Sequence, residues 1–288
     1  MTVSLLLVLL RGAHVAALLS AFGTLAFARL MPAPGVVLAL RLGRLALYSA
    51  ALALALGIAW LAAEAGAIAG VNGPVRAFAA VPEMLAYFRF GRLLLARLVL
   101  LAAVVILLGV GRGVRACLVL TAVSAALQPL LAHAGAVFGV RGDVLVASEI
   151  VHLLVAGAWA GGLTPLLLTL RTLPASEAAR MLRRFGRLGV IAVLAIMASG
   201  ILQLGILTRG FAGLVGTPYG AAMATKLALF AAALVLALLN RSVLIGRIAG
   251  PRPRESRRAI DLSVGVEAML ALCIVLAAGW LASLAPGM

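Results

Sequence analysis

The chain has three histidines, and His14, His133 and His152 all stand inside apolar stretches. A polar group buried in hydrocarbon is costly and is usually functional. Neutral imidazole is the commonest metal ligand among side chains. Glu149 stands three residues before His152, on the same face of a helix. The pattern therefore predicts one metal site made by the three histidines, with Glu149 as a further ligand or as the carboxylate that orients the His152 ring.

Two other interpretations of these polar residues stay open. Each histidine can instead be a core residue of a helix bundle, bonded to a backbone carbonyl or to a hydroxyl group. Glu149 can instead pair with a nearby guanidinium, either Arg11 or Arg141.

The composition shows what surrounds these residues. Of 288 residues, 65% are hydrophobic and 11% are charged, and the mean hydropathy is +1.22. A soluble domain of this size could not bury so much apolar surface, whereas charge-poor runs of about 20 residues are typical of membrane-spanning helices. We predict an all-α integral membrane protein, a single membrane domain over residues 1–288, with eight spans at 3–29, 41–63, 92–111, 116–138, 144–169, 188–208, 220–240 and 260–284.

The net charge of +16 is unevenly distributed along the predicted spans. Most of the arginines fall in the loops after spans one, three, five and seven, including the stretches 180–187 and 241–258. The positive-inside rule makes these loops cytoplasmic. Both termini and all three histidines then lie on the periplasmic side of a bacterial inner membrane, with Trp60 and Trp280 as interfacial anchors. Topology and the lipid bilayer explain the charge, and nucleic-acid binding is not expected.

The two halves of the chain, approximately 1–140 and 141–288, resemble each other. The matched positions are His14 with His152, Gly23 with Gly161, Gly57 with Gly200, and Arg97 with Lys226. Each half contains four spans, so both halves begin on the same side. The expected architecture is a 4+4 parallel repeat, with its pseudo-twofold axis along the membrane normal. Chance similarity between Leu- and Ala-rich helices is the alternative.

Three motifs carry a resemblance to a known family. They are H-x6-W-x-G-G from His152, TPYG-x5-K from Thr217, and LNR from Leu239. Together they resemble the CopD copper-resistance family. The resemblance extends over the whole chain and is strongest over approximately 144–284, and it is to the eight-helix form of the family, which is expected to lack a fused CopC-like domain. It implies a protein that binds copper, accepts it from a periplasmic carrier of CopC type, and transfers or transports it across the inner membrane.

The resemblance carries over to individual positions. His152 and His133 match motif histidines, and His14 follows through the repeat. Trp159, Gly161 and Gly162 are expected to serve packing, the glycines by letting helices approach closely. For the later motifs we expect interfacial anchoring by Tyr219 and by Lys226, whose side chain would extend outward; no chemistry is assigned to Asn240 and Arg241.

A route below the histidines would need polar or soft groups, and the last span supplies Glu267, Met269 and Cys273. Copper(I) prefers thioether and thiolate ligands, and the two sulfur residues stand four apart on one helix face. The alternatives are that Glu267 pairs with Arg115, and that the methionine only fills the core.

Two rival functions follow from the same residues. Histidines from different helices can clamp a haem iron in an electron-transfer protein, for which Gly23 and Gly161 would leave space between helices. The chain can also be a non-catalytic partner that docks a periplasmic carrier through the loop that begins at Pro74. No nucleophile–base constellation, phosphate loop or pair of catalytic carboxylates is present, so no enzymatic activity is expected. The oligomeric state stays open.

Overall fold

The computed structural model describes residues 5–31, 35–132, 135, 137–208, 214–240 and 253–284. In this part of the chain the secondary structure is helical throughout, and eight helical segments are long and apolar enough to cross a membrane. The prediction of an all-α, multi-pass membrane protein is confirmed. The helices are α1 (Leu5–Leu30), α2 (Val36–Ala69), α3 (Pro74–Ala79), α4 (Val81–Tyr87), α5 (Arg89–Gly109), α6 (Val114–Ala126), α7 (Val140–Ala160), α8 (Leu163–Leu170), α9 (Ala175–Leu207), α10 (Pro218–Leu239) and α12 (Pro253–Leu281).

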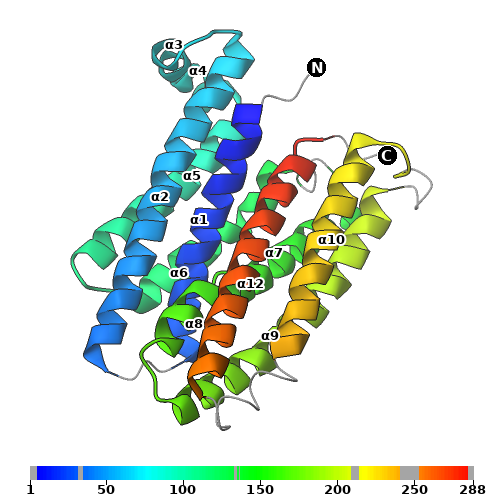
Figure 1. Ribbon diagram of the computed structural model, residues 1–288. Helices are drawn as coiled ribbons and strands as arrows, with labels where there is room; N and C mark the ends of the chain where they lie inside the picture. The colour runs from blue at the N-terminus through cyan, green and yellow to red at the C-terminus, as the bar shows by residue number, and fades with distance from the viewer. Residues whose placement is uncertain are drawn as a thin grey trace.

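The long helices form one bundle around α1 (Figure 1). Helix α1 packs against α2, α6, α7 and α12, while α7 packs against α9 and α10 packs against α12. Helix α1 begins and α12 ends at the same end of the bundle, and the short helices α3 and α4 also lie there (Figure 1). We call this the terminal end. Every residue predicted as a metal ligand that the structure describes lies in the half of the bundle nearer to it.

Two spans differ from their predicted extent because of proline. The span predicted at 144–169 is divided into α7 and α8, since Pro165 has no N–H to bond the carbonyl of Gly161. The span predicted to reach residue 138 has its α-helix end at Ala126, followed by a 3₁₀ turn over Gln128–Leu131 that contains Pro129. Helix α9 begins at Ala175, earlier than predicted, because the arginine-rich stretch 180–187 is itself helical.

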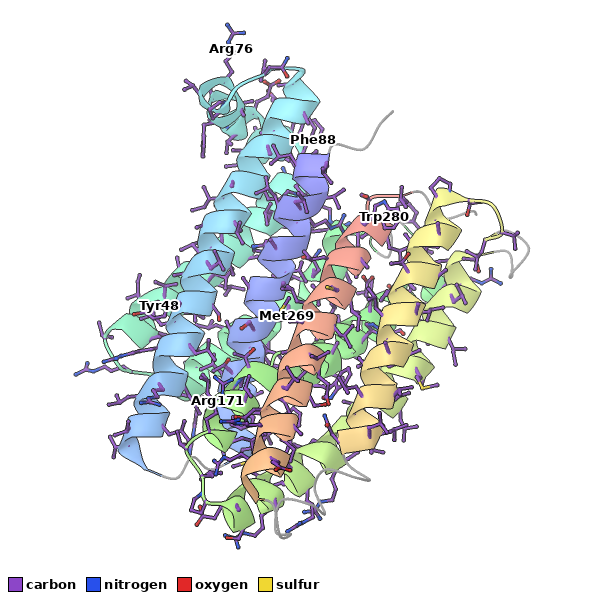
Figure 2. All side chains as sticks on the ribbon, viewed as in Figure 1. Tyr48, Arg76, Phe88, Arg171, Met269 and Trp280 are labelled. Atoms are coloured by element: carbon purple, nitrogen blue, oxygen red, sulfur yellow. The ribbon has the colours of Figure 1, made fainter. Side chains whose placement is uncertain are left out.

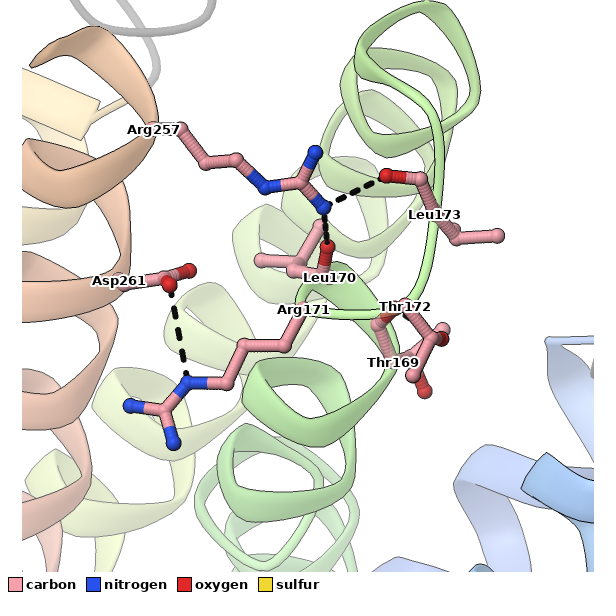
Figure 3. Close-up of polar contacts among 7 residues, drawn as sticks. All are labelled: Thr169, Leu170, Arg171, Thr172, Leu173, Arg257 and Asp261. Atoms are coloured by element: carbon pink, nitrogen blue, oxygen red, sulfur yellow. Dashed lines mark hydrogen bonds and ion pairs between the residues drawn. The ribbon is translucent and has the colours of Figure 1, made fainter. Parts of the chain in front are cut away.

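At the end opposite the terminal end, α12 is fastened to the connection between α8 and α9 (Figure 3). One Arg257 nitrogen donates to the carbonyls of Leu170 and of Leu173, the latter at 2.6 Å. The Arg171 guanidinium lies 3.6 Å from the carboxylate of Asp261. These contacts fix the start of α12. They therefore also set the depth in the bundle at which the later polar residues of this helix lie.

Candidate functional site

His14 is held rigidly between α1 and α2. It lies about 14 Å along α1 from the start of the helix and its side chain is 0% exposed. Its Nδ1 lies 2.7 Å from the backbone oxygen of Ala53. A carbonyl only accepts, so Nδ1 carries the proton and Nε2 of the neutral ring keeps a free lone pair. That Nε2 is buried and has no hydrogen-bond partner among the described residues.

The wall of the His14 pocket is aromatic. The His14 ring lies 5.7 Å from the ring of Trp60, which also meets the ring of Phe90 at 5.4 Å and the Arg11 guanidinium at 5.7 Å. The Trp60 indole N–H donates to Glu64 at 3.0 Å. Trp60 is 0% exposed, so the expectation of an interfacial anchor at this position is wrong. The indole instead packs beside the histidine.

His152 is held in a similar way between α7 and α9. Its Nδ1 lies 2.9 Å from the Ser199 hydroxyl oxygen. That hydroxyl donates its own proton to the carbonyl of Ala195 at 2.6 Å, so it accepts from the ring. Gly200 faces the ring, since a Cβ built there would lie 4.0 Å from its Cε1 atom. The Nε2 atom of the neutral His152 ring therefore also keeps a free lone pair.

The basic groups around His152 are partly balanced by one carboxylate. Glu149 interacts electrostatically with Arg11 of α1 and with Lys226 of α10, and Lys226 also interacts with His152. Lys226 is partly buried and within electrostatic range of the acid and the ring. Tyr219 is 5% exposed and packs with Leu281. The expectation of interfacial anchoring by Tyr219 is wrong, because its side chain is buried inside the bundle.

The charge beside His14 has no such balance, and the sequence interpretation gave it no role. Arg97 of α5 is 0% exposed, and its Nε donates to the carbonyl of Ser124 at 2.9 Å. Its two terminal nitrogens have no hydrogen-bond partner among the described residues. Its electrostatic neighbours are His14 and Arg11, both basic side chains. The match of Arg97 with Lys226 in the repeat was the signal that could have identified it.

No three His, Cys, Asp or Glu side chains of the described residues lie close enough together to hold a metal ion. His14, Glu149 and His152 thus do not surround one ion in this structure, and His133 lies outside the described residues. The periodicity of the α-helix explains why the residues are apart. His14 precedes Gly23 by about two and a half turns, so it stands on the opposite side of α1 from Gly23, which contacts α7.

Helices α1 and α7 meet through glycines at nearly the closest possible distance. A Cβ built on Gly23 would lie 2.4 Å from the carbonyl oxygen of Gly157, and one built on Gly161 would lie 2.1 Å from that of Leu19. A Cβ on Gly162 would lie 2.9 Å from the ring of Phe185. The space between Gly23 and Gly161 is filled by backbone. The open volume that a haem would need at this place is therefore absent.

Of the three predicted pathway residues on α12, one points inward and two do not. Glu267 is 5% exposed and accepts a hydrogen bond from Asn240 of α10, so its partner is Asn240 and not the expected Arg115. Met269 is 60% exposed and Cys273 is also exposed on the same helix. Their sulfur atoms therefore belong to the surface of the bundle. Arg241 lies outside the described residues.

The other motif residues have structural roles. Trp159 is 7% exposed and meets the ring of Phe230 edge-on at 6.3 Å. Thr217 caps α10, because its hydroxyl oxygen accepts from the N–H of Gly220 at 3.0 Å. Pro218 then opens the helix at a position where no N–H is needed. The TPYG motif therefore forms the N-terminal cap and the first turn of α10.

Comparison with protein-family models gives two matches. Residues 1–144 match the model described as copper resistance protein D-like, N-terminal domain, and residues 179–281 match the model described as copper resistance protein D. The chain belongs to the copper resistance protein D family. The family resemblance inferred from the sequence motifs is confirmed, and membership indicates a role in copper handling. Neither the comparison with curated proteins nor that with solved structures gives a match.

The matched ranges leave out residues 145–178. This segment contains Glu149, His152 and the α7 glycines of the α1–α7 contact, whereas Lys226, Asn240 and Glu267 fall within the second match. The H-x6-W-x-G-G motif therefore lies outside both matched ranges.

Proposed function

We propose that this copper resistance protein D family member accepts copper in the periplasm and passes it across the bacterial inner membrane. The observation that carries the proposal is the arrangement of Glu149, His152 and Lys226 in the bundle of a chain from a copper-handling family. It provides a negative charge and an imidazole lone pair in the half of the bundle nearer the terminal end.

The proposed orientation in the membrane follows from the distribution of the arginines. The arginine-rich stretch 180–187 lies in the first part of α9, at the end opposite the terminal end, and the positive-inside rule assigns that end to the cytoplasm. The terminal end is then periplasmic, with both chain termini there. Tags at either terminus should react with a membrane-impermeant reagent in intact cells, whereas a cysteine placed at residue 254 should not. The reverse labelling pattern would contradict the orientation and the direction from which copper reaches His152.

Glu149 and His152 are the proposed first ligands. Imidazole and carboxylate both suit copper(II), and the carboxylate offsets the charge of the cation. The Ser199 hydroxyl fixes the ring through Nδ1, as the outer neighbours of metal-bound histidines do. In the ion-free protein Lys226 supplies the positive charge next to Glu149. Arriving copper would displace its ammonium group.

His14 is proposed as a separate copper position and not as a ligand of the same ion. Its ring faces α2 and Arg97, within the first half of the chain, while His152 faces α9 and Lys226 in the second. His133 follows the 3₁₀ turn that ends at Leu131, and it stays a candidate ligand for either position.

The halves around these positions are proposed to be a parallel repeat. Gly23 touches the carbonyl of Gly157, and Gly161 touches that of Leu19. In the sequence match Gly23 corresponds to Gly161, and Leu19 corresponds to Gly157. A reciprocal contact between equal positions is what a twofold axis generates, which supports an axis through the α1–α7 crossing.

The passage toward the cytoplasm is proposed to involve Glu267. This carboxylate and the amide of Asn240 join α10 to α12 in the cytoplasmic half, and Glu267 is the buried acid of the described residues there. Glu267→Gln in reconstituted vesicles should slow copper flux at least about tenfold and leave the ion at His152 bound. Unchanged flux would remove Glu267 from the pathway.

A carrier of CopC type is proposed to deliver the ion at the terminal end. Helices α3 and α4 present exposed aromatic and basic side chains there, and Arg76 extends away from the bundle (Figure 2). Replacing Arg76 and Tyr87 by alanine should slow transfer from a copper-loaded carrier while leaving binding of free copper unchanged.

Copper stoichiometry in purified protein tests the proposal directly. The protein in detergent is loaded with copper, and the bound metal is measured for wild type and for His14→Ala, His133→Ala and His152→Ala. We expect His152→Ala to lose one ion that His14→Ala retains. Met223→Leu, near the same end of α10, is the control and should bind as wild type. Equal copper content in wild type and His152→Ala, both folded, would contradict the proposal.

A further inference from the structure

Arg97 is a buried positive charge without a negative partner. Its side chain is 0% exposed, and no carboxylate of the described residues lies within ion-pair distance of it or interacts with it electrostatically. A guanidinium does not lose its proton in proteins. A lysine could relieve such burial by becoming neutral, but arginine cannot. The charge therefore needs compensation from a group that is not part of the described chain.

The charges that face this position leave Arg97 uncompensated. From α1, Arg11 is a second positive charge, with Glu149 and Glu64 as its own acidic partners, and His14 adds a ring that is not negative. From α2, Glu64 is engaged by the Trp60 N–H and by Arg11. Ser124 of α6 and Gln128 of the following 3₁₀ turn are neutral groups. On α5 itself, Arg92 is exposed and bonds the carbonyl of Ala86.

Unused hydrogen-bond donors gather at the same place. The Nε atom of Arg97 donates to the backbone carbonyl of Ser124, so this residue of α6 lies against the guanidinium. Both terminal nitrogens of Arg97 and the hydroxyl of Ser124 are buried and without a partner among the described residues. A guanidinium fork with free N–H groups next to a free hydroxyl is suited to an acceptor that carries negative charge.

We propose that a small monovalent inorganic anion of the chloride class binds between α1, α5 and α6, held by the terminal nitrogens of Arg97 with the nearby hydroxyl of Ser124. The complete burial of Arg97 excludes a lipid phosphate or a bulky organic acid. The anion offsets the positive charge of Arg97 next to His14. The matching position of the second half has no such need, because Glu149 interacts electrostatically with Lys226 there.

Equilibrium binding of radioactive chloride to the full-length protein in detergent tests the site. The protein is prepared in gluconate buffer without copper, and chloride is added. We expect one saturable chloride per chain, displaced by bromide and not by gluconate. Arg97→Gln should weaken binding at least tenfold, and the control Arg92→Gln, on the exposed face of the same helix, should bind as wild type. Saturable binding that persists in folded Arg97→Gln would overturn the proposal.

A second measurement uses the wild-type protein alone, in case Arg97→Gln does not fold. Crystals of the full chain grown in bromide should show an anomalous peak within hydrogen-bond distance of the terminal nitrogens of Arg97. A water molecule at that position, with no anomalous signal, would show that solvent alone satisfies the donors and would overturn the proposal. Because copper is absent from both experiments, their outcome is independent of the proposed copper transfer.

Discussion

The two halves of the bundle hold their histidines alike and surround them with opposite charges. His14 and His152 are both fixed through Nδ1 by the second long helix of their own half. The positions that differ are Arg11 and Glu149, which correspond in the sequence match, so the second half has an acid where the first has a base. The comparison teaches that the scaffold of a histidine pocket can be kept while its charge, and hence the ion it favours, is changed.

The same contrast extends through the depth of the bundle. The second half contains two acids inside the bundle, Glu149 near the terminal end and Glu267 below it. At corresponding depths the first half has buried hydroxyl groups on α6 and the amide of Gln128 in the following 3₁₀ turn, together with Arg97. The charges of the described residues therefore favour a cation more strongly along the second half than beside His14 in the first. Four experiments test this difference between the two halves.

The largest effect is expected where the halves meet. Gly161→Leu places a side chain where a Cβ would already lie 2.1 Å from the Leu19 carbonyl oxygen, so α1 and α7 must separate. We expect loss of folded protein, measured by size-exclusion chromatography and thermal unfolding in detergent. Gly23→Leu should behave in the same way. Gly186→Ala, with nothing within 4 Å of its Cβ position, is the control. A stable Gly161→Leu protein would show that the crossing is looser than described.

Removing the acid should have the next largest effect. Glu149→Gln keeps the shape of the side chain and removes the negative charge next to His152. Copper affinity, measured by competition with a chelator, should fall about 10- to 100-fold, the range found when a supporting group of a metal site is lost. Arg11→Gln, at the corresponding position of the first half, should not lower it. Equal losses in both variants would indicate one shared site.

Removing the competing cation should act in the opposite direction. Lys226→Met keeps the length of the side chain and frees Glu149 from its ammonium partner. Copper affinity should rise about tenfold, equivalent to about 1.4 kcal/mol. Its counterpart Arg97→Met should leave copper affinity at His152 unchanged. A decrease in copper affinity for Lys226→Met would show that the lysine supports the site and does not compete for it.

The smallest effect concerns the start of the third long helix in each half. Thr217 caps α10 with its side chain, whereas Phe88 at the start of α5 makes no such cap. Thr217→Ala should therefore lower the free energy of unfolding by about 1 kcal/mol. Thr225→Ala, exposed on the same helix, is the matched control. The free energies of unfolding of the two variants are compared by denaturant titration in mixed micelles. Equal values would contradict a stabilising role of the Thr217 cap.

Much of the fold could be predicted because the bilayer acts on runs of about 20 residues. The number and order of the spans came from the positions of apolar runs and arginines alone. Their ends were less predictable. The breaks at Pro165 and Pro129 depend on single missing N–H groups, and the helical start of α9 adds polar residues that hydropathy assigns to a loop.

For the candidate site, the sequence by itself determined which residue types stand at which depth, since depth follows from helix rise. It placed His14, Glu149 and His152 in the same half of the membrane, but it predicted that the Lys226 side chain would extend outward. Only the tertiary structure decided which way each side chain faces. The crossing at Gly23 and Gly161 fixes the rotation of α1 and α7, because glycine alone permits backbone contact there. That rotation directs the two histidines to different sides of the α1–α7 crossing. It could not be predicted from the sequence, because it depends on contacts between helices that are distant in the chain.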